Sequence, residues 1–166
     1  MKIEYIPNLG FIVNSQKFLW GQERNIIREY LKNQHTEEDK IIEMSEFFDG
    51  DTSFDIEQKR DIYHDINAEE NYFFLNYDND GNLEALEIHS GVLILIKDFE
   101  LVFEKDINNY LKYFNSIGEN YLEIEYGNFL FENLKMTIAN SESMGGEGNG
   151  LSYFYSSNDI EHLKEE

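Results

Sequence analysis

Alternation of apolar and polar residues marks most of the strands that the sequence predicts. Apolar side chains alternate with polar ones at residues 122–126 and 134–138, and the runs at 99–103 and 151–155 are similar. Such a pattern is typical of a strand with one buried face and one face in water. Residues 92–96 are apolar without alternation, which predicts a strand covered on both sides.

A β-hairpin is predicted in the middle of the chain. The aromatic-rich run 72–77 and the apolar run 83–88 flank the segment Asp78-Asn79-Asp80-Gly81-Asn82. An Asp-Gly pair between two such runs favours a tight connection between antiparallel strands.

Helical periodicity is found in fewer places. Apolar residues fall on one helix face at 26–31 and at 107–114, which predicts helices over about 22–34 and from about 105. Thr36 with acidic residues directly after it resembles a helix N-cap and first turn, so a third helix is predicted from there to about Phe48. A short helix near 54–63 is also expected.

These elements predict a single α+β domain over residues 1–166, built from antiparallel sheet and a few helices. Two apolar strands followed by a helix occur early in the chain, and the same order returns after Gly91. This favours two β-β-α-β-β half-repeats at 8–90 and 91–157, with an acidic insert at 34–70. Chance similarity of alternating patterns is the other interpretation.

The distribution of charge along the chain gives information about function. The formal net charge is -21, yet residues 1–33 are slightly basic, whereas 34–70 hold thirteen acidic and three basic residues. An acidic surface repels nucleic acid and anionic membranes and attracts basic proteins. We therefore expect a basic protein partner, no nucleic acid and no membrane. Acidity that serves only solubility is the alternative.

The residues that would carry such binding are exposed carboxylates. Those of the acidic segment and of the strand at 122–126 are the candidates, interleaved with tyrosines that suit protein interfaces. The predicted partner-binding residues are Glu37, Glu38, Asp39, Glu43, Glu46, Glu123 and Glu125.

Catalytic and cofactor motifs are missing from the sequence. There is no Cys, no H-E-x-x-H and no G-x-S-x-G, and the glycines at 145–150 precede a predicted strand rather than a helix. We expect no enzyme activity and no cofactor. An N-terminus without an apolar signal region, together with the lack of Cys, predicts a cytoplasmic protein.

A calcium loop is the alternative site. Asn76, Asp78, Asp80 and Glu87 stand at the ligand spacing of an EF-hand, with Gly81 at the turning position. An EF-hand needs a helix on either side, whereas strands are predicted here. A structural hairpin is therefore preferred over a metal site.

Several segments together resemble small acidic bacterial proteins that act as immunity proteins in polymorphic toxin systems. The residues that carry the resemblance are Arg60-Asp61-Ile62-Tyr63, Tyr72–Tyr77 with Asp78-Asn79-Asp80-Gly81, Leu86-Glu87-Ile88, and Met144–Asn149 leading into Tyr153-Phe154-Tyr155. The resemblance implies that the chain binds and neutralises a cognate toxin, often a basic nuclease. It implies no catalytic residues.

Overall fold

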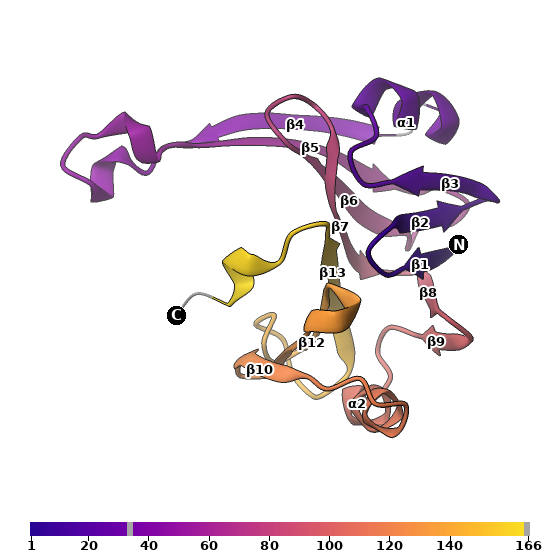
Figure 1. Cartoon of the computed structure of the whole chain (residues 1–166). Coiled ribbons are helices and arrows are strands. Elements are labelled where there is room, and N and C mark those ends of the chain that lie inside the picture. Colours follow the sequence, from indigo (N-terminus) through magenta and orange to yellow (C-terminus); the bar gives the residue numbers. More distant parts are fainter. Residues whose placement is uncertain (33–34, 165–166) are drawn as a thin grey trace.

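The computed structural model describes residues 1–32 and 35–164, without the side chain of Glu46, and shows an α+β fold rich in strand (Figure 1). The expected fold class is confirmed. The strands are β1 Lys2–Ile6, β2 Gly10–Val13, β3 Gln16–Leu19, β4 His35–Ile42, β5 Ile56–His64, β6 Tyr72–Tyr77, β7 Leu83–Ser90, β8 Leu93–Ile96, β9 Phe99–Leu101, β10 Leu122–Glu125, β11 Asn128–Phe131, β12 Met136–Asn140 and β13 Leu151–Ser157, and the helices are α1 Arg24–Leu31 and α2 Ile107–Ser116.

The smaller sheet joins two hairpins through the first strand of the chain. Its strand order is β3-β2-β1-β8-β9, and β1 pairs antiparallel with β2 but parallel with β8. In β8, Ile94 and Ile96 are buried, whereas Leu93 and Leu95 are half-buried. This strand was expected to be covered on both sides, and it is more completely covered on one side than on the other.

The larger sheet has eight strands in the order β10-β11-β12-β13-β7-β6-β5-β4, all antiparallel. Each half of the chain supplies a four-stranded meander that follows its helix, and the two meanders meet where β13 pairs with β7. Residues 34–70 thus contribute two paired strands, β4 and β5. Each half has four strands after its helix, in place of the two strands that were expected, with an insert in the first half.

The sequence predicts an apolar face on each helix, and α2 buries more of its face than α1 does. In α2, Ile107, Tyr110, Leu111 and Phe114 are all buried, and the Asp106 side chain caps the helix by accepting from the amide of Asn108 at 3.0 Å. In α1 only Ile27 and Leu31 are buried. That helix is shorter than predicted.

The predicted helices over 36–48 and 54–63 are wrong, because these segments form most of β4 and β5. Every residue of β4 has a cross-strand partner on β5, from His35 opposite Tyr63 to Ile42 opposite Ile56. β5 in turn pairs with β6. Pairing with β5, aided by β-branched residues at both ends of the pair, outweighs the weak local preference that acidic residues after Thr36 suggest.

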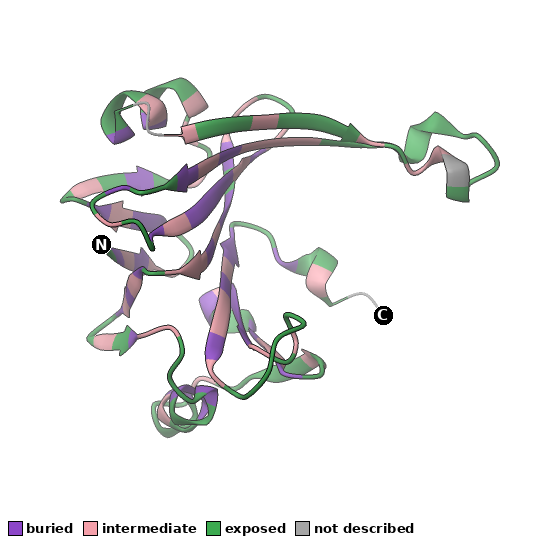
Figure 2. Ribbon diagram, turned by 180° about the vertical axis from the view of Figure 1, so that it is seen from behind, coloured by how far each residue is buried: buried purple, intermediate pink, exposed green. Residues whose placement is uncertain are grey.

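One cluster of buried apolar side chains contains residues from both sheets and both helices. Tyr5 of β1 illustrates the junction, since its ring meets Phe154 of β13 edge-on at 5.6 Å and its hydroxyl donates to the carbonyl of Leu134 at 2.6 Å. Figure 2 shows the buried residues along the facing strands, with the far ends of β4 and β5 outside this core. No helix within the described part of the chain is long and apolar enough to cross a membrane.

Candidate functional site

A long hairpin extends away from the body of the molecule and is the most distinctive feature of its surface (Figure 1). It consists of the end of β4, the start of β5 and the segment 43–55 between them; we call residues 41–57 the arm and residues 43–55 its tip. The corresponding strands at the opposite edge of the sheet, β10 and β11, have four residues each, whereas β4 has eight and β5 nine. Completing the sheet edge therefore does not require the extra length of the arm.

The tip has a defined local structure that two aspartates hold. Asp55 accepts hydrogen bonds from the amides of Met44 at 2.8 Å and Ser45 at 3.0 Å, which ties the two ends of the tip together. Asp51 caps a short 3-10 turn by accepting from the amide of Ser53 at 2.9 Å. These carboxylates stabilise the tip itself, so fewer acids are left to meet a partner.

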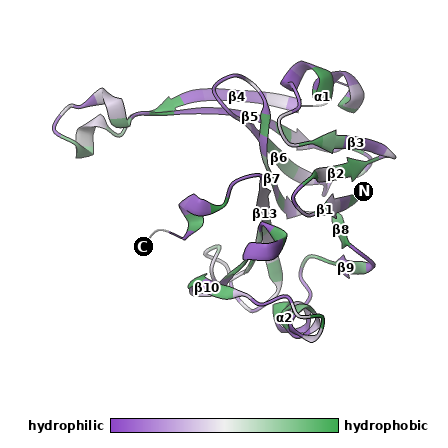
Figure 3. Ribbon diagram, viewed as in Figure 1, coloured by the Kyte–Doolittle hydropathy of each residue, from purple (hydrophilic) through white to green (hydrophobic). Residues whose placement is uncertain are grey.

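Large apolar side chains are exposed along the arm. Phe47 is 78% exposed, and Phe48 stacks on Phe54 with ring centroids 4.3 Å apart while both remain partly exposed. Ile41 and Ile56 are exposed at the base of the tip, and Figure 3 shows this hydrophobic end of β4 after a mainly hydrophilic strand. Apolar side chains gathered at the end of a projecting hairpin are typical of a binding surface.

Acidic residues surround these apolar groups. Residues 41–57 contain six acidic residues and no basic one. Glu57 is paired with Lys59 at 3.1 Å, just beyond the arm. The arm thus combines an apolar tip with a negative rim, which is the composition that a basic partner with an apolar contact patch would match.

The root of the hairpin is fixed to α1 by a buried ionic network. The Asp61 side chain is fully buried on β5 and accepts from Arg24 at 2.7 Å, from Arg28 at 2.6 Å and from the Tyr77 hydroxyl at 3.2 Å. Burial alone would raise the pKa of the Asp61 carboxyl, but the hydrogen bonds and charges of Arg28 and Arg24 outweigh it and lower that pKa. Asp61 therefore stays ionised and holds the helix to the sheet.

The outer carboxylates of this network belong to β4. Asp39 receives two hydrogen bonds of 2.8 Å from Arg24, and these bonds lower the pKa of its carboxyl. Glu37 pairs with Arg28. Both residues were predicted to bind a partner, and in the structure both hold β4 against α1.

The other predicted binding residues lie in three places. Glu38 pairs with Arg60 at 3.4 Å and with Lys40 at 3.5 Å, and Glu43 is exposed in the tip. The Glu46 side chain lies outside the described residues. Glu123 and Glu125 are on β10 at the opposite edge of the eight-stranded sheet, where Glu123 accepts from the amide of Gly127 at 2.9 Å. The structure does not bring the predicted acids into one site.

Sequence reasoning missed the phenylalanines of the tip and the Asp61 network. A signal for the first was present, because Phe47, Phe48 and Phe54 stand in a segment rich in acidic residues and free of basic ones. The second had no local signal, since Arg24 and Asp61 are 37 residues apart.

The predicted calcium residues are arranged around a hairpin connection. Asn76 on β6 donates to Glu87 on β7, and Asp78 Oδ1 accepts from the amides of Asp80 at 3.0 Å and Asn82 at 2.8 Å. Strands flank the segment on both sides. Asp78 Oδ1 is thus engaged in the turn and Glu87 Oε1 in a cross-strand hydrogen bond, whereas a calcium loop would direct both residues at one ion.

A second group, of one histidine and two acidic residues, has the spacing of metal ligands. Ligand atoms of His35, Glu37 and Asp61 lie within 4.8 Å of one another, the only such group of three among the described residues. Arg28 already binds both carboxylates of this group. A bound metal cation would meet two guanidinium groups, so the arrangement suits an ionic network and not a metal.

No family model, no curated protein and no solved structure matches this chain.

Proposed function

We propose that this chain is a non-catalytic acidic binding protein that neutralises a basic toxin, such as a nuclease, and that the arm is its main docking element. The observation that carries the proposal is the combination found in the arm: exposed aromatic side chains within a segment of six acids and no base. The resemblance to immunity proteins of polymorphic toxin systems supports the same class of function.

The two parts of the arm would contribute differently to binding. Acidic side chains at the rim raise the association rate with a basic protein and make it depend on salt. Phe47 would supply affinity, because a large side chain that is exposed in the free protein removes much apolar area from water when a partner covers it.

The arrangement of the arm also supports a binding role. The network around Asp61 fixes the root of the hairpin, and Asp55 closes its tip. A binding element that is already ordered loses less conformational entropy when it meets its partner. The side chains that hold this structure differ from those that would meet the partner.

The proposal predicts that a neighbouring gene encodes a protein with a basic toxin domain, and the test measures association with that domain. The arm variant carries Glu43→Gln, Asp49→Asn and Glu57→Gln, which leaves Asp51 and Asp55 in place. A matched control carries Glu4→Gln, Glu29→Gln and Glu147→Gln elsewhere on the chain, with the same change in net charge. We expect the arm variant to associate about 10-fold more slowly at low salt and with a weaker salt dependence, and the control to stay close to wild type.

Inhibition of the toxin's activity completes the test. The wild-type chain should abolish the activity at stoichiometric amounts. Equal loss of association in the two variants would show that only total charge matters. A folded chain that neither binds nor inhibits the domain would contradict the proposal and support a structural or adaptor domain without a toxin partner.

A further inference from the structure

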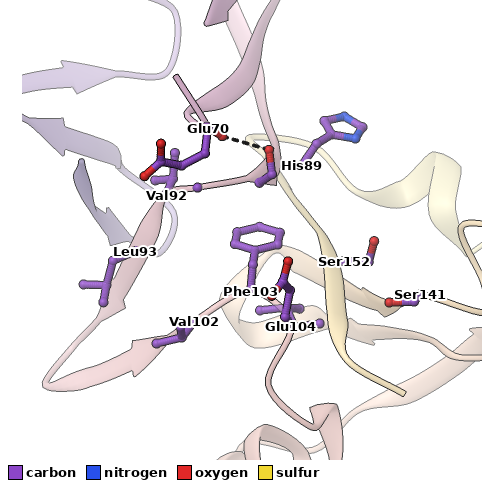
Figure 4. Close-up of a pocket in the computed structure, with 12 residues that line it drawn as sticks. Glu70, His89, Val92, Leu93, Val102, Phe103, Glu104, Ser141 and Ser152 are labelled. Carbon is purple, nitrogen blue, oxygen red and sulfur yellow. Dashed lines mark hydrogen bonds between the residues drawn. The ribbon is translucent and has the colours of Figure 1, made fainter. Parts of the chain in front are cut away.

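A cleft of about 480 Å³ lies where the two sheets meet, between the end of β7, the β8–β9 hairpin and the start of β13 (Figure 4). The strands that line it lie away from the arm (Figure 1). None of the described residues that form the arm lines this cleft. An activity here would therefore be independent of the arm.

The walls of the cleft are mainly apolar. Val92 and Leu151 are almost fully buried, and the half-buried ring of Phe103 projects into the space in Figure 4. An accessible aromatic ring beside buried aliphatic side chains provides a surface on which a flat or extended apolar group can pack.

Carboxylates stand at the rim. Glu70 comes from the loop before β6 and Glu104 from the turn after β9, and they lie on either side of Phe103 in Figure 4. Both residues are exposed. No lysine or arginine is among the described residues that line the cleft. Its charge is therefore complementary to a cation.

The backbone holds both rim residues in place. A Cβ at Gly91 would lie 2.2 Å from the carbonyl oxygen of Glu70, and one at Gly150 would lie 2.9 Å from that of Glu104. Close approach of the chain at these points thus requires glycine. The Ser90 hydroxyl also donates to the Glu70 carbonyl at 2.9 Å, and the Glu104 amide donates to the Leu151 carbonyl at 2.9 Å. The fold therefore fixes the backbone positions of both rim residues.

We infer that this cleft binds an arginine side chain of a protein partner. An arginine has an aliphatic stem that can pack on the apolar wall and a planar cationic head that can stack on an aromatic ring while it donates to carboxylates. Those three properties match the half-buried side chains of Leu93 and Val102, the ring of Phe103, and the carboxylates of Glu70 and Glu104. The inference does not rest on the proposed toxin partner, because it concerns a different surface and a different probe.

The experiment is a methyl-detected NMR titration of the whole chain with the tripeptide acetyl-Gly-Arg-Gly-amide. Its citrulline counterpart keeps the shape of the side chain and removes the charge. We expect saturable shifts of the Val92, Val102 and Leu151 methyl groups with the arginine peptide, at a dissociation constant on the order of 1 mM, and binding at least about 10-fold weaker with citrulline.

Variants separate this site from general attraction to an acidic protein. Glu70→Gln with Glu104→Gln should weaken arginine binding about 10-fold, whereas Glu29→Gln with Glu147→Gln should leave it unchanged. Phe103→Leu should also weaken it, and the methyl spectrum of each variant reports whether the fold is intact. Equal binding of the citrulline peptide, equal loss in both pairs of variants, or no shift at these methyl groups would overturn the inference. Agmatine binding about 10-fold tighter than the peptide would likewise overturn it, in favour of a small-molecule cation.

Discussion

Arg24 and Asp61 are joined by two hydrogen bonds, of 3.1 Å from Nε and 2.7 Å from Nη2, although one residue begins α1 and the other lies within β5. Arg28 approaches the same carboxylate one helical turn later. Asp61 is thus the point at which the helix, the long hairpin and the sheet are connected.

Asp61→Asn should destabilise the protein strongly. The substitution removes the fully buried carboxylate that faces the two arginines, and both guanidinium groups then lose part of the negative charge that balances them. Loss of one partner from a buried pair costs about 3–5 kcal/mol. Urea denaturation measures the change, with Asp98→Asn in an exposed turn as the control, which should stay within about 0.5 kcal/mol. Equal stability of the two variants would show that the network contributes little.

The carboxylates of this network predict how the stability of the protein depends on pH. The pKa values of Asp61 and Asp39 are lower in the folded protein than in the unfolded chain. Their contribution is therefore fully present above the unfolded carboxyl pKa, about 3.9, and is lost as the pH falls through the folded values. The difference in unfolding free energy between wild type and Asp61→Asn should shrink between neutral pH and pH of about 3. A constant difference over that range would contradict the ionic explanation.

Truncation of a phenylalanine should affect the stability of the protein strongly in the core and only slightly in the arm. Phe47 is 78% exposed and Phe73 is fully buried. We expect Phe47→Ala to change the unfolding free energy by less than about 0.5 kcal/mol and Phe73→Ala to lower it by about 3–5 kcal/mol. Thermal and urea melts make the comparison. A large loss for Phe47→Ala would mean that the tip is part of the stability of the fold and not a free surface.

Calcium should leave the melting temperature unchanged. Asp78 accepts from amides of its own turn, and Glu87 is bonded to Asn76. A ligand that binds only the folded state raises its stability by mass action, so a site with a dissociation constant of about 1 mM or less would be visible in millimolar Ca²⁺. An increase in melting temperature that Asp78→Asn abolishes would restore the calcium hypothesis.

The sequence predicts elements well where the signal is local. The apolar face at 107–114 becomes the buried face of α2, and the runs around Asp78–Asn82 become a hairpin. It fails at 36–48, where acids after Thr36 suggest a helix but the partner that makes the segment a strand lies on β5. Strand pairing depends on distant residues, and a local pattern does not contain them.

The candidate site, too, could be predicted from the sequence only in part. The acidity of 34–70 is visible in the sequence, and Glu43 is indeed exposed at the tip. Which acids are free is not visible, because Glu37 and Asp39 are bound by arginines of α1. The apolar tip was predictable in principle from its phenylalanines, whereas its projection from the body follows from the length of the paired strands.

Removal of the tip tests the proposed role of the arm most directly. Ile42 and Ile56 are cross-strand partners, so an Asn-Gly turn can join them in place of residues 43–55. The shortened chain should keep the free energy of unfolding of the wild type, because the core and the Asp61 network remain. Its affinity for the basic toxin domain, measured by calorimetry, should fall at least about 100-fold. Wild-type affinity in the folded, shortened chain would contradict the assignment of the arm as the docking element.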